Sequence, residues 1–153
     1  MTDLQEIKGS PPIIVEKVHT KKKLQQALKI RYQVFVIGQM VPVEEEIDDF
    51  EKDSFLYLAQ IDGLPCGAAR WRFTNEGVKL ERFAVLEKYR RLGVGSALVK
   101  KVLKDIRKHP ESNGRKIYLH AQLNAMKLYS NFGFKQIGEL FQECDIDHYK
   151  MVK

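Results

Sequence analysis

The turn at residues 88–96 carries the most chemically specific pattern in the chain. Its cations and glycines are Lys88, Arg90, Arg91, Gly93 and Gly95. Glycine lets the backbone approach a ligand closely, and the unpaired N–H groups and dipole of a helix start attract anions. A basic turn with two glycines before a helix is therefore typical of a phosphate site.

The residues around this turn exclude two common kinds of phosphate site. A strand is predicted at 80–85 before the turn, and a helix at 94–106 after it, where apolar residues recur every four positions. A dinucleotide fingerprint would need a third glycine where the chain has Leu98, and no P-loop sequence is present. On this feature alone, a structural turn and a phosphate site are equally supported.

Two motifs together resemble those of GCN5-related N-acetyltransferases, the GNAT family. The string Arg90-x-x-Gly93-x-Gly95 is similar to the family's acyl-CoA pyrophosphate motif, and Ala125-x-x-Leu128-Tyr129 followed by Gly133-Phe134 is similar to its second motif. The segment 31–36 with Pro42 and its acidic followers resembles the small uncharacterised bacterial branch. The resemblance covers about residues 13–152. It implies transfer of an acetyl group from acetyl-CoA directly to a primary amine of a small molecule or peptide.

The resemblance also implies which residues bind the cofactor, acetyl-CoA. Main-chain groups of Phe83 and Val85 would pair with the pantetheine arm, and an N–H near Val85 would polarise the thioester oxygen. The family usually has asparagine seven residues before the tyrosine, whereas this chain has Gln122 there and Asn124 nearby, so the contacting amide stays open. The expected cofactor-binding residues are Phe83, Ala84, Val85, Arg90, Arg91, Leu92, Gly93, Val94, Gly95, Ser96, Gln122, Asn124 and Tyr129.

Tyr129 is the candidate catalytic acid. A phenol with a pKa of about 10 gives a proton to a thiolate of pKa about 8.5 only uphill. Tyr129 is therefore expected either to hydrogen-bond the leaving thiolate or to have its pKa lowered by the basic surroundings.

Three residues are candidates for the base that deprotonates the amine. Glu81 can act directly or through water, and its alternative role is a surface glutamate paired with Lys79 or Arg82. His120 and His148 are the other candidates because imidazoles titrate near neutral pH.

The acceptor pocket is predicted to contain Tyr32, Arg70, Trp71 and Arg72. The segment 44–53 holds seven carboxylates, which form either a solvated acidic loop or frayed helix, or a rim that attracts a cationic amine. No metal is expected, because the acidic spacing does not fit a calcium loop and the two cysteines belong to no metal-ligand pair.

Hydrophobic periodicity predicts a single α/β (α+β) domain at 13–153, after a flexible tail at 1–12. Strands are predicted at 13–19, 55–61, 66–73, 80–85, 116–121, 134–137 and 148–152. Helices are predicted from a Thr20 cap to about Gly38, over 93–108 and over 124–132. The resulting sheet is mixed and mostly antiparallel, with a central parallel strand pair flanked by helices. The resemblance implies that the strands ending at Val85 and Gln122 splay apart.

Charge and hydropathy limit the partners. The net charge is +6, and residues 86–116 hold ten Lys/Arg against three Asp/Glu. This excess fits a phosphorylated cofactor, a solvated helix face or a nucleic-acid-binding module. Nucleic acid is not expected, because aromatic residues are not interleaved with the basic ones and the acidic segment would repel phosphates.

A non-catalytic CoA-binding sensor, with the fold kept and the base absent, is the other alternative function. No apolar run reaches the roughly 20 residues of a membrane helix and no secretory signal is visible, so a cytoplasmic protein without membrane partners is expected. The oligomeric state stays open, a homodimer included.

Overall fold

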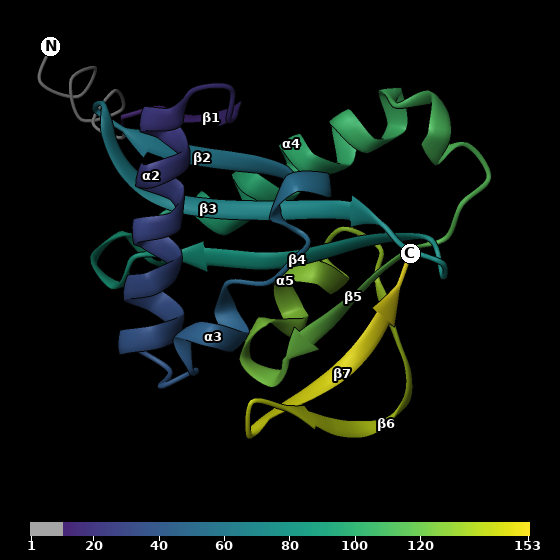
Figure 1. Cartoon of the computed structure of the whole chain (residues 1–153). Helices are drawn as coiled ribbons and strands as arrows, with labels where there is room; N and C mark the ends of the chain where they lie inside the picture. Colours follow the sequence, from purple (N-terminus) through teal and green to yellow (C-terminus); the bar gives the residue numbers. More distant parts are fainter. Residues whose placement is uncertain (1–10) are drawn as a thin grey trace, which may run out of the picture.

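A seven-stranded sheet forms the centre of the computed structural model, which describes residues 11–153 (Figure 1). The strands are β1 (Ile13–Lys17), β2 (Phe55–Ile61), β3 (Leu64–Phe73), β4 (Val78–Val85), β5 (Ile117–Gln122), β6 (Lys135–Glu143) and β7 (Ile146–Val152). The α-helices are α2 (Lys21–Arg31), α3 (Val43–Glu46), α4 (Val94–Lys108) and α5 (Met126–Ser130), and a π-helical segment, η1 (Tyr32–Ile37), continues α2. The predicted tail lies outside the described residues, except for Pro11 and Pro12, which belong to no helix or strand.

The strand order is β1-β2-β3-β4-β5-β7-β6. The pair β4–β5 is parallel, and the neighbouring strands pair antiparallel. Helix α4 forms the crossover between β4 and β5, as a parallel connection requires. The predicted fold class, a mixed and mostly antiparallel sheet with a central parallel pair, is confirmed.

Strands β4 and β5 part after a short paired stretch. They pair from Val78 with Ile117 to Leu80 with Leu119, although the strands continue to Val85 and Gln122. Beyond Leu80, the main-chain groups of β4 that face β5 therefore lack ladder partners on that strand. The splay that the resemblance implied is present.

A β-bulge lies in β4 at the point where the strands part. Between the pairs Arg70–Glu81 and Ala68–Ala84, β4 has one residue more than β3. Arg82 lies in this bulge. Its φ is 60°, a left-handed value that is uncommon for a residue with a side chain. Bulges bend a strand and redirect its side chains, so this one turns β4 away from β5.

Helices cover both faces of the sheet (Figure 1). Helix α4 and the Tyr129 turn pack on one face, in a core with Trp71, Leu98 and Leu119. Helix α2 packs on the other face through Ala27 and Ile30.

Gly67 of β3 allows α4 to begin close to the sheet. A Cβ atom at this position would lie 2.8 Å from Val94 Cγ1 and 3.1 Å from Leu98 Cδ1. A side chain here would push the first turn of α4 outward. The glycine therefore helps to position the helix start that follows the basic turn.

Three acidic residues of 44–53 form a buried ion-pair network with arginines. Arg31 and Arg70 are 1% and 0% exposed, respectively. The ion pairs join Arg31 to Glu46 and Glu51, Arg70 to Asp48, Glu51 and Glu81, and Arg82 to Glu46 and Asp48. The predicted alternatives, a solvated loop or an amine-attracting rim, are both wrong for Glu46, Asp48 and Glu51.

The network shifts the pKa values of its members. Burial alone would raise the pKa of Asp48, but hydrogen bonds and charge from Arg70 outweigh it and hold the pKa at about 2. The same balance, with charge from Arg70 as the main opposing effect, lowers the pKa of Glu81. Both carboxylates are therefore ionised near neutral pH.

Some element boundaries differ from the predicted ones. Thr20 caps α2 as predicted, since its Oγ1 accepts from Lys23 N–H at 3.2 Å. Gly38 has a φ of −74°, so its role is steric: a Cβ atom there would lie 2.6 Å from the Val34 carbonyl oxygen. The C-terminal strands are longer than predicted, because β6 continues past Gly138 through a bulge.

We expect Arg70→Met to lower the free energy of unfolding by about 3–5 kcal/mol, because it leaves three carboxylates at a buried site without their shared cation. Urea denaturation at neutral pH measures this difference. Arg107 is exposed on α4, and Arg107→Met should change stability by no more than about 0.5 kcal/mol. Equal effects of the two substitutions would show that the network contributes little to stability.

Candidate active site

A cavity of about 650 Å³ occupies the splay between β4 and β5. One end lies at the basic turn and the start of α4, and the other reaches α3 and the tip of the β6–β7 hairpin. Phe83, Leu98 and Tyr129 line the cavity between these two ends. A long ligand with an anionic end therefore has a continuous path through the sheet.

The start of α4 presents free N–H groups to this cavity. Gly93 is the N-terminal cap, with a φ of 92° that favours glycine. The first main-chain hydrogen bond of the helix runs from Ala97 N–H to the Gly93 carbonyl at 3.0 Å. Val94, Gly95 and Ser96 precede it, so their N–H groups have no partner within the helix. This turn has the features of an anion site.

Two arginines hold the same turn in place and give it positive charge. Arg90 Nε donates to the Val85 carbonyl at 3.0 Å and so ties the turn to the end of β4. Arg90 and Arg91 both line the cavity, whereas Leu92 is 57% exposed and lies outside it. Of the predicted cofactor-binding residues, only Leu92 is not brought to the cavity.

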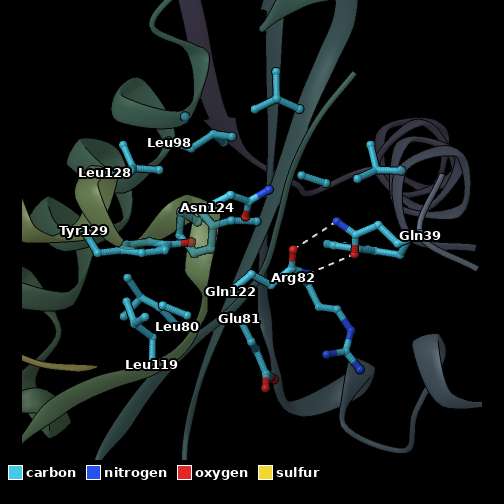
Figure 2. A pocket seen from close by; sticks show the side chains of 18 of the residues that line it. Gln39, Leu80, Glu81, Arg82, Leu98, Leu119, Gln122, Asn124, Leu128 and Tyr129 are labelled. Carbon is cyan, nitrogen blue, oxygen red and sulfur yellow. Dashed lines mark hydrogen bonds between the residues drawn. The ribbon is translucent and has the colours of Figure 1, made fainter. Parts of the chain in front are cut away.

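An amide pair links the two sides of the splay. Gln39 Nε2 donates to Gln122 Oε1 at 3.1 Å, and Gln122 Nε2 donates back to Gln39 Oε1 at 2.9 Å. Figure 2 shows Gln39 reaching Gln122 from the side of the cavity opposite Tyr129. Since the Gln122 amide is occupied by this pair, Asn124, which also lines the cavity, is the better placed amide for a bound ligand.

Tyr129 is 7% exposed and lies between two aromatic rings. Its ring meets Phe83 edge-on at 5.9 Å and Phe134 at 6.1 Å between centroids. Its hydroxyl points into the cavity (Figure 2). Burial raises the pKa of Tyr129, so the expectation that basic surroundings lower it is wrong, and the phenol keeps its proton.

Glu81 lines the cavity, but cations already surround its carboxylate. Oε2 accepts from Arg70 Nε at 2.9 Å and from Arg72 Nε at 2.6 Å, and Oε1 lies 3.4 Å from Lys79 Nζ. A carboxylate with a lowered pKa and three cationic partners is a weak base. The arrangement favours the ion-paired alternative for Glu81, with Lys79 as predicted but with Arg70 and Arg72 in place of Arg82, and with the side chain only 8% exposed and not at the surface.

Two histidines and a glutamate gather at the far end of the cavity. His120 Nδ1 lies 2.9 Å from Glu143 Oε2, and His148 Nε2 lies 3.8 Å from Glu143 Oε1. His148 Nδ1 is 2.7 Å from the Ile146 carbonyl, which can only accept, so the proton of a neutral ring sits on Nδ1. The lone pair of His148 Nε2 is then free for an incoming donor.

None of the residues predicted for the acceptor pocket lines the cavity. Tyr32 is 46% exposed, and Arg70 is held inside the ion-pair network. Trp71 lies in the core on the α4 face, stacked on Phe55 at 4.2 Å. Arg72 stacks over the Phe50 ring at 3.8 Å. Consecutive strand residues point to opposite faces, so Arg70, Trp71 and Arg72 could not all face one pocket.

The residues that do line this end come from three separate segments. They are Gln39, Glu45, Lys79, Glu143 and Cys144. The sequence indicated Glu45 only as a member of the acidic segment 44–53 and Lys79 only as a partner of Glu81, and none of the five was predicted to line the acceptor pocket. Gln39 and Glu45 lie on loops or short helices whose position depends on the tertiary fold. No local spacing could have identified them.

The part of the chain that the structure describes has neither a metal-binding cluster nor a helix that could span a membrane. Among residues 11–153 no group of three or more His, Cys, Asp or Glu side chains is arranged to hold a metal ion. No helix in the same range has the length and hydropathy of a membrane span.

A family model for the acetyltransferase (GNAT) domain matches residues 16–153. The chain belongs to the GNAT acetyltransferase family. The family, the acyltransferase class and acetyl-CoA as the cofactor, all predicted from the two motifs, are confirmed.

Individual GNAT relatives are similar to this chain in sequence or in structure over nearly its whole length. The uncharacterised N-acetyltransferase YjcF of Bacillus subtilis is 34% identical over 134 residues, covering 87% of this chain and 94% of that protein. The crystal structure of Escherichia coli ElaA superposes with a TM-score of 0.81 at 26% identity, covering 93% and 99% of the two chains. Arabidopsis thaliana Naa50, in complex with the bisubstrate analogue CoA-Ac-MVNAL, has a TM-score of 0.69 at 28% identity, covering 92% and 97%.

We expect Gly95→Val to raise the Kd for CoA at least about tenfold. A Cβ atom at Gly95 would already lie 3.2 Å from Leu128 Cδ2, so the branched side chain must displace Leu128 or fill the cavity. Isothermal titration calorimetry measures the affinity, and the melting temperature of the free protein controls for folding. Ala97→Val adds a similar branch outside the cavity and should leave the Kd unchanged. Unaltered CoA affinity in Gly95→Val would contradict the phosphate role of this turn.

Proposed function

We propose that this GNAT enzyme acetylates a primary amine, with His148 as the base and Tyr129 as the proton donor. The observation that carries the proposal is the free Nε2 lone pair of His148 and the protonated Tyr129 hydroxyl in one cavity. The two side chains approach the splay from opposite faces of the sheet. Tyr129 packs with Leu119 on the α4 face, whereas His148 pairs with Gln122, whose side chain points to the α2 face.

The residues around the splay fit acetyl-CoA. The N–H groups of Val94, Gly95 and Ser96, with Arg90 and Arg91, suit a diphosphate. The β4 edge at 83–85 has no ladder partner on β5, and its main-chain groups, apart from the Val85 carbonyl that Arg90 holds, suit an arm rich in amides. Asn124 supports a further amide contact. Bound acetyl-CoA supplies a thioester whose C–S bond is exchanged for a C–N bond, with one proton lost from nitrogen and one gained by sulfur.

Tyr129 serves the sulfur side of this exchange. Burial keeps the phenol protonated, so it donates a hydrogen bond to the sulfur and stabilises charge that develops there. Phe83 and Phe134 hold the ring in place and exclude water from it. A preorganised donor of this kind contributes roughly 3–4 kcal/mol to lowering a barrier.

His148 serves the nitrogen side. Its Nδ1–H is fixed on the Ile146 carbonyl, which orients Nε2 toward the cavity. Glu143, 3.8 Å from Nε2, stabilises the positive charge that the ring acquires when it takes the amine proton. Glu81 is surrounded by cations and is less suited to this role. His120 also uses Nδ1, on Glu143, and so leaves its own Nε2 free, but its side chain is 24% exposed against 9% for His148, which makes His148 the first choice.

Free-thiol release from acetyl-CoA in the presence of an amine panel tests the proposed function. Acetylation of at least one primary amine supports it. Binding of CoA without thiol release for any amine would instead support a non-catalytic CoA sensor. The cytoplasmic location, the absence of nucleic-acid partners and a homodimer stay predictions; the free thiols of Cys66 and Cys144 suit a reducing compartment.

We expect Tyr129→Phe to lower kcat about 100-fold and to change the Kd for CoA by no more than about twofold, because the ring remains packed and only the donor is lost. Thiol release and calorimetry measure the two quantities. Tyr118→Phe is the matched control, since that hydroxyl is 2.7 Å from Thr74 Oγ1 and lies outside the cavity. An unchanged kcat in Tyr129→Phe would remove Tyr129 from the mechanism.

We expect His148→Gln to lower kcat/KM about 100-fold near neutral pH, and the loss should shrink as pH rises because solvent then deprotonates more of the amine. The pH dependence of kcat/KM measures both effects. His120→Gln, which changes the other histidine bound to Glu143, should cost much less. A larger loss in His120→Gln than in His148→Gln would reverse the assignment.

A further inference from the structure

The end of the cavity farthest from the basic turn is bounded by two segments that are distant in sequence. Glu45 of α3 and Glu143 of β6 both line it. Cys144 Sγ donates to Glu45 Oε2 at 2.7 Å, so the hairpin tip and α3 meet at this point. We call this end, with the carboxylates of Glu45 and Glu143, the acidic mouth.

The carboxylates of the acidic mouth differ from those of the ion-pair network. Every network carboxylate holds at least one arginine. Within residues 11–153 the Glu45 side chain has no cationic partner, and the ion-pair partners of Glu143 are the two histidines. The hydrogen bond from His120 lowers the pKa of Glu143, so this carboxylate is ionised. The mouth therefore carries negative charge that the protein leaves available to a ligand.

Two nearby cations form their ion pairs elsewhere, although the charge of Lys79 also helps to lower the pKa of Glu143. Lys79 and Arg82 line the same half of the cavity. Lys79 Nζ lies 3.4 Å from Glu81, and the Arg82 guanidinium pairs with Glu46 and Asp48 at 3.1 Å each. Neither forms an ion pair with the carboxylate of Glu45 or Glu143, and Arg82 meets Glu45 only at its main-chain carbonyl, at 3.2 Å.

His148 provides an independent sign that a nitrogen ligand belongs here. The residue is 7% exposed, and its Nε2 makes no hydrogen bond within the described chain. Because Nε2 has no protein hydrogen-bond partner and opens into the cavity, where solvent reaches it, a donor from a ligand can bind it in place of water. Nε2 faces Glu143 at 3.8 Å, which places this donor beside the acidic mouth.

We propose that the acceptor is an aliphatic diamine or polyamine, with one nitrogen at His148 Nε2 and a second, cationic nitrogen at Glu45 and Glu143. This inference rests on the proposed function and adds the substrate class. An amine without a second charge leaves the mouth unpaired, and an amine that carries a carboxylate is repelled by it. The second ammonium is fixed at the mouth while the first is deprotonated and acetylated.

The test compares three four-carbon acceptors with the full chain and acetyl-CoA: 1,4-diaminobutane, butylamine and 4-aminobutanoate. We expect kcat/KM for the diamine to exceed that for butylamine at least about tenfold, and 4-aminobutanoate to be the poorest, because one charge-assisted contact corresponds to roughly this factor. Glu45→Gln should bring the diamine-to-butylamine ratio close to one.

Two control variants distinguish the effect of the Glu45 charge from the effects of neighbouring residues. Glu44→Gln removes a neighbouring exposed charge that does not line the cavity, and Cys144→Ala removes the thiol contact but keeps the Glu45 carboxylate. Both should retain the diamine preference. Loss of the preference in either control to the same degree as in Glu45→Gln would overturn the assignment to the Glu45 charge.

A binding measurement provides a readout independent of turnover. CoA has no acetyl group to transfer, so calorimetry on the CoA-saturated protein reports diamine affinity alone. We expect Glu45→Gln to raise the Kd for 1,4-diaminobutane about tenfold.

Three results would overturn the acceptor class while leaving acetyl transfer intact. They are equal kcat/KM for the diamine and butylamine, an unchanged ratio in Glu45→Gln, and a clear preference for an amino sugar or a peptide N-terminus over the diamine. Failure of every amine, with CoA bound, would instead overturn the proposed function itself.

Discussion

The parting of β4 and β5 beyond Leu80 and Leu119 is the constraint on which the rest of the structure depends. Strands that stayed paired would satisfy their own main-chain groups and close the sheet. By separating, they leave the β4 edge at 81–85 without ladder partners on β5, which is costly unless water or a ligand supplies hydrogen bonds. An arm rich in amides can do so, which is why the splay suits acetyl-CoA.

Several contacts keep this gap from closing. The bulge at Arg82 bends β4, and Arg82 is held from outside the sheet by the Glu46 carbonyl at 3.2 Å and by Asp48. Asp48 is bound in turn by Arg70, so the bend is coupled to the buried ion-pair network. On the β5 side, the amide pair of Gln39 and Gln122 links the strand end to the segment after η1.

The parting of β4 and β5 also opens a cavity whose two ends carry opposite charge. The cationic turn and the free N–H groups of α4 lie at one end of the cavity, and the carboxylates of Glu45 and Glu143 lie at the other. Opposite charges at the two ends give each substrate its own entrance. In the proposed mechanism, the reacting atoms meet between Tyr129 and His148, beside the part of β4 that has no ladder partner on β5.

Local sequence patterns predicted the elements whose structure depends on interactions between residues close in sequence. The four-residue repeat of α4, the glycines of its first turn and the order of the two motifs were sufficient to predict the fold and the residues that line the basic end of the cavity. The acceptor end could not be predicted in this way. Arg70 and Trp71 are adjacent in sequence but point to opposite faces, and Gln39 reaches the site through a π-helical turn that periodicity does not indicate. Glu45 and Cys144 meet only because a short helix and a hairpin tip fold against each other.

A crystal structure of the chain with bound acetyl-CoA tests the central claim most directly. The account predicts pantetheine amides hydrogen-bonded to the main chain at 83–85, and a diphosphate on the N–H groups of Val94, Gly95 and Ser96. A cofactor bound elsewhere would contradict it. So would strands β4 and β5 paired to their ends, with the turn's N–H groups filled by the protein's own side chains.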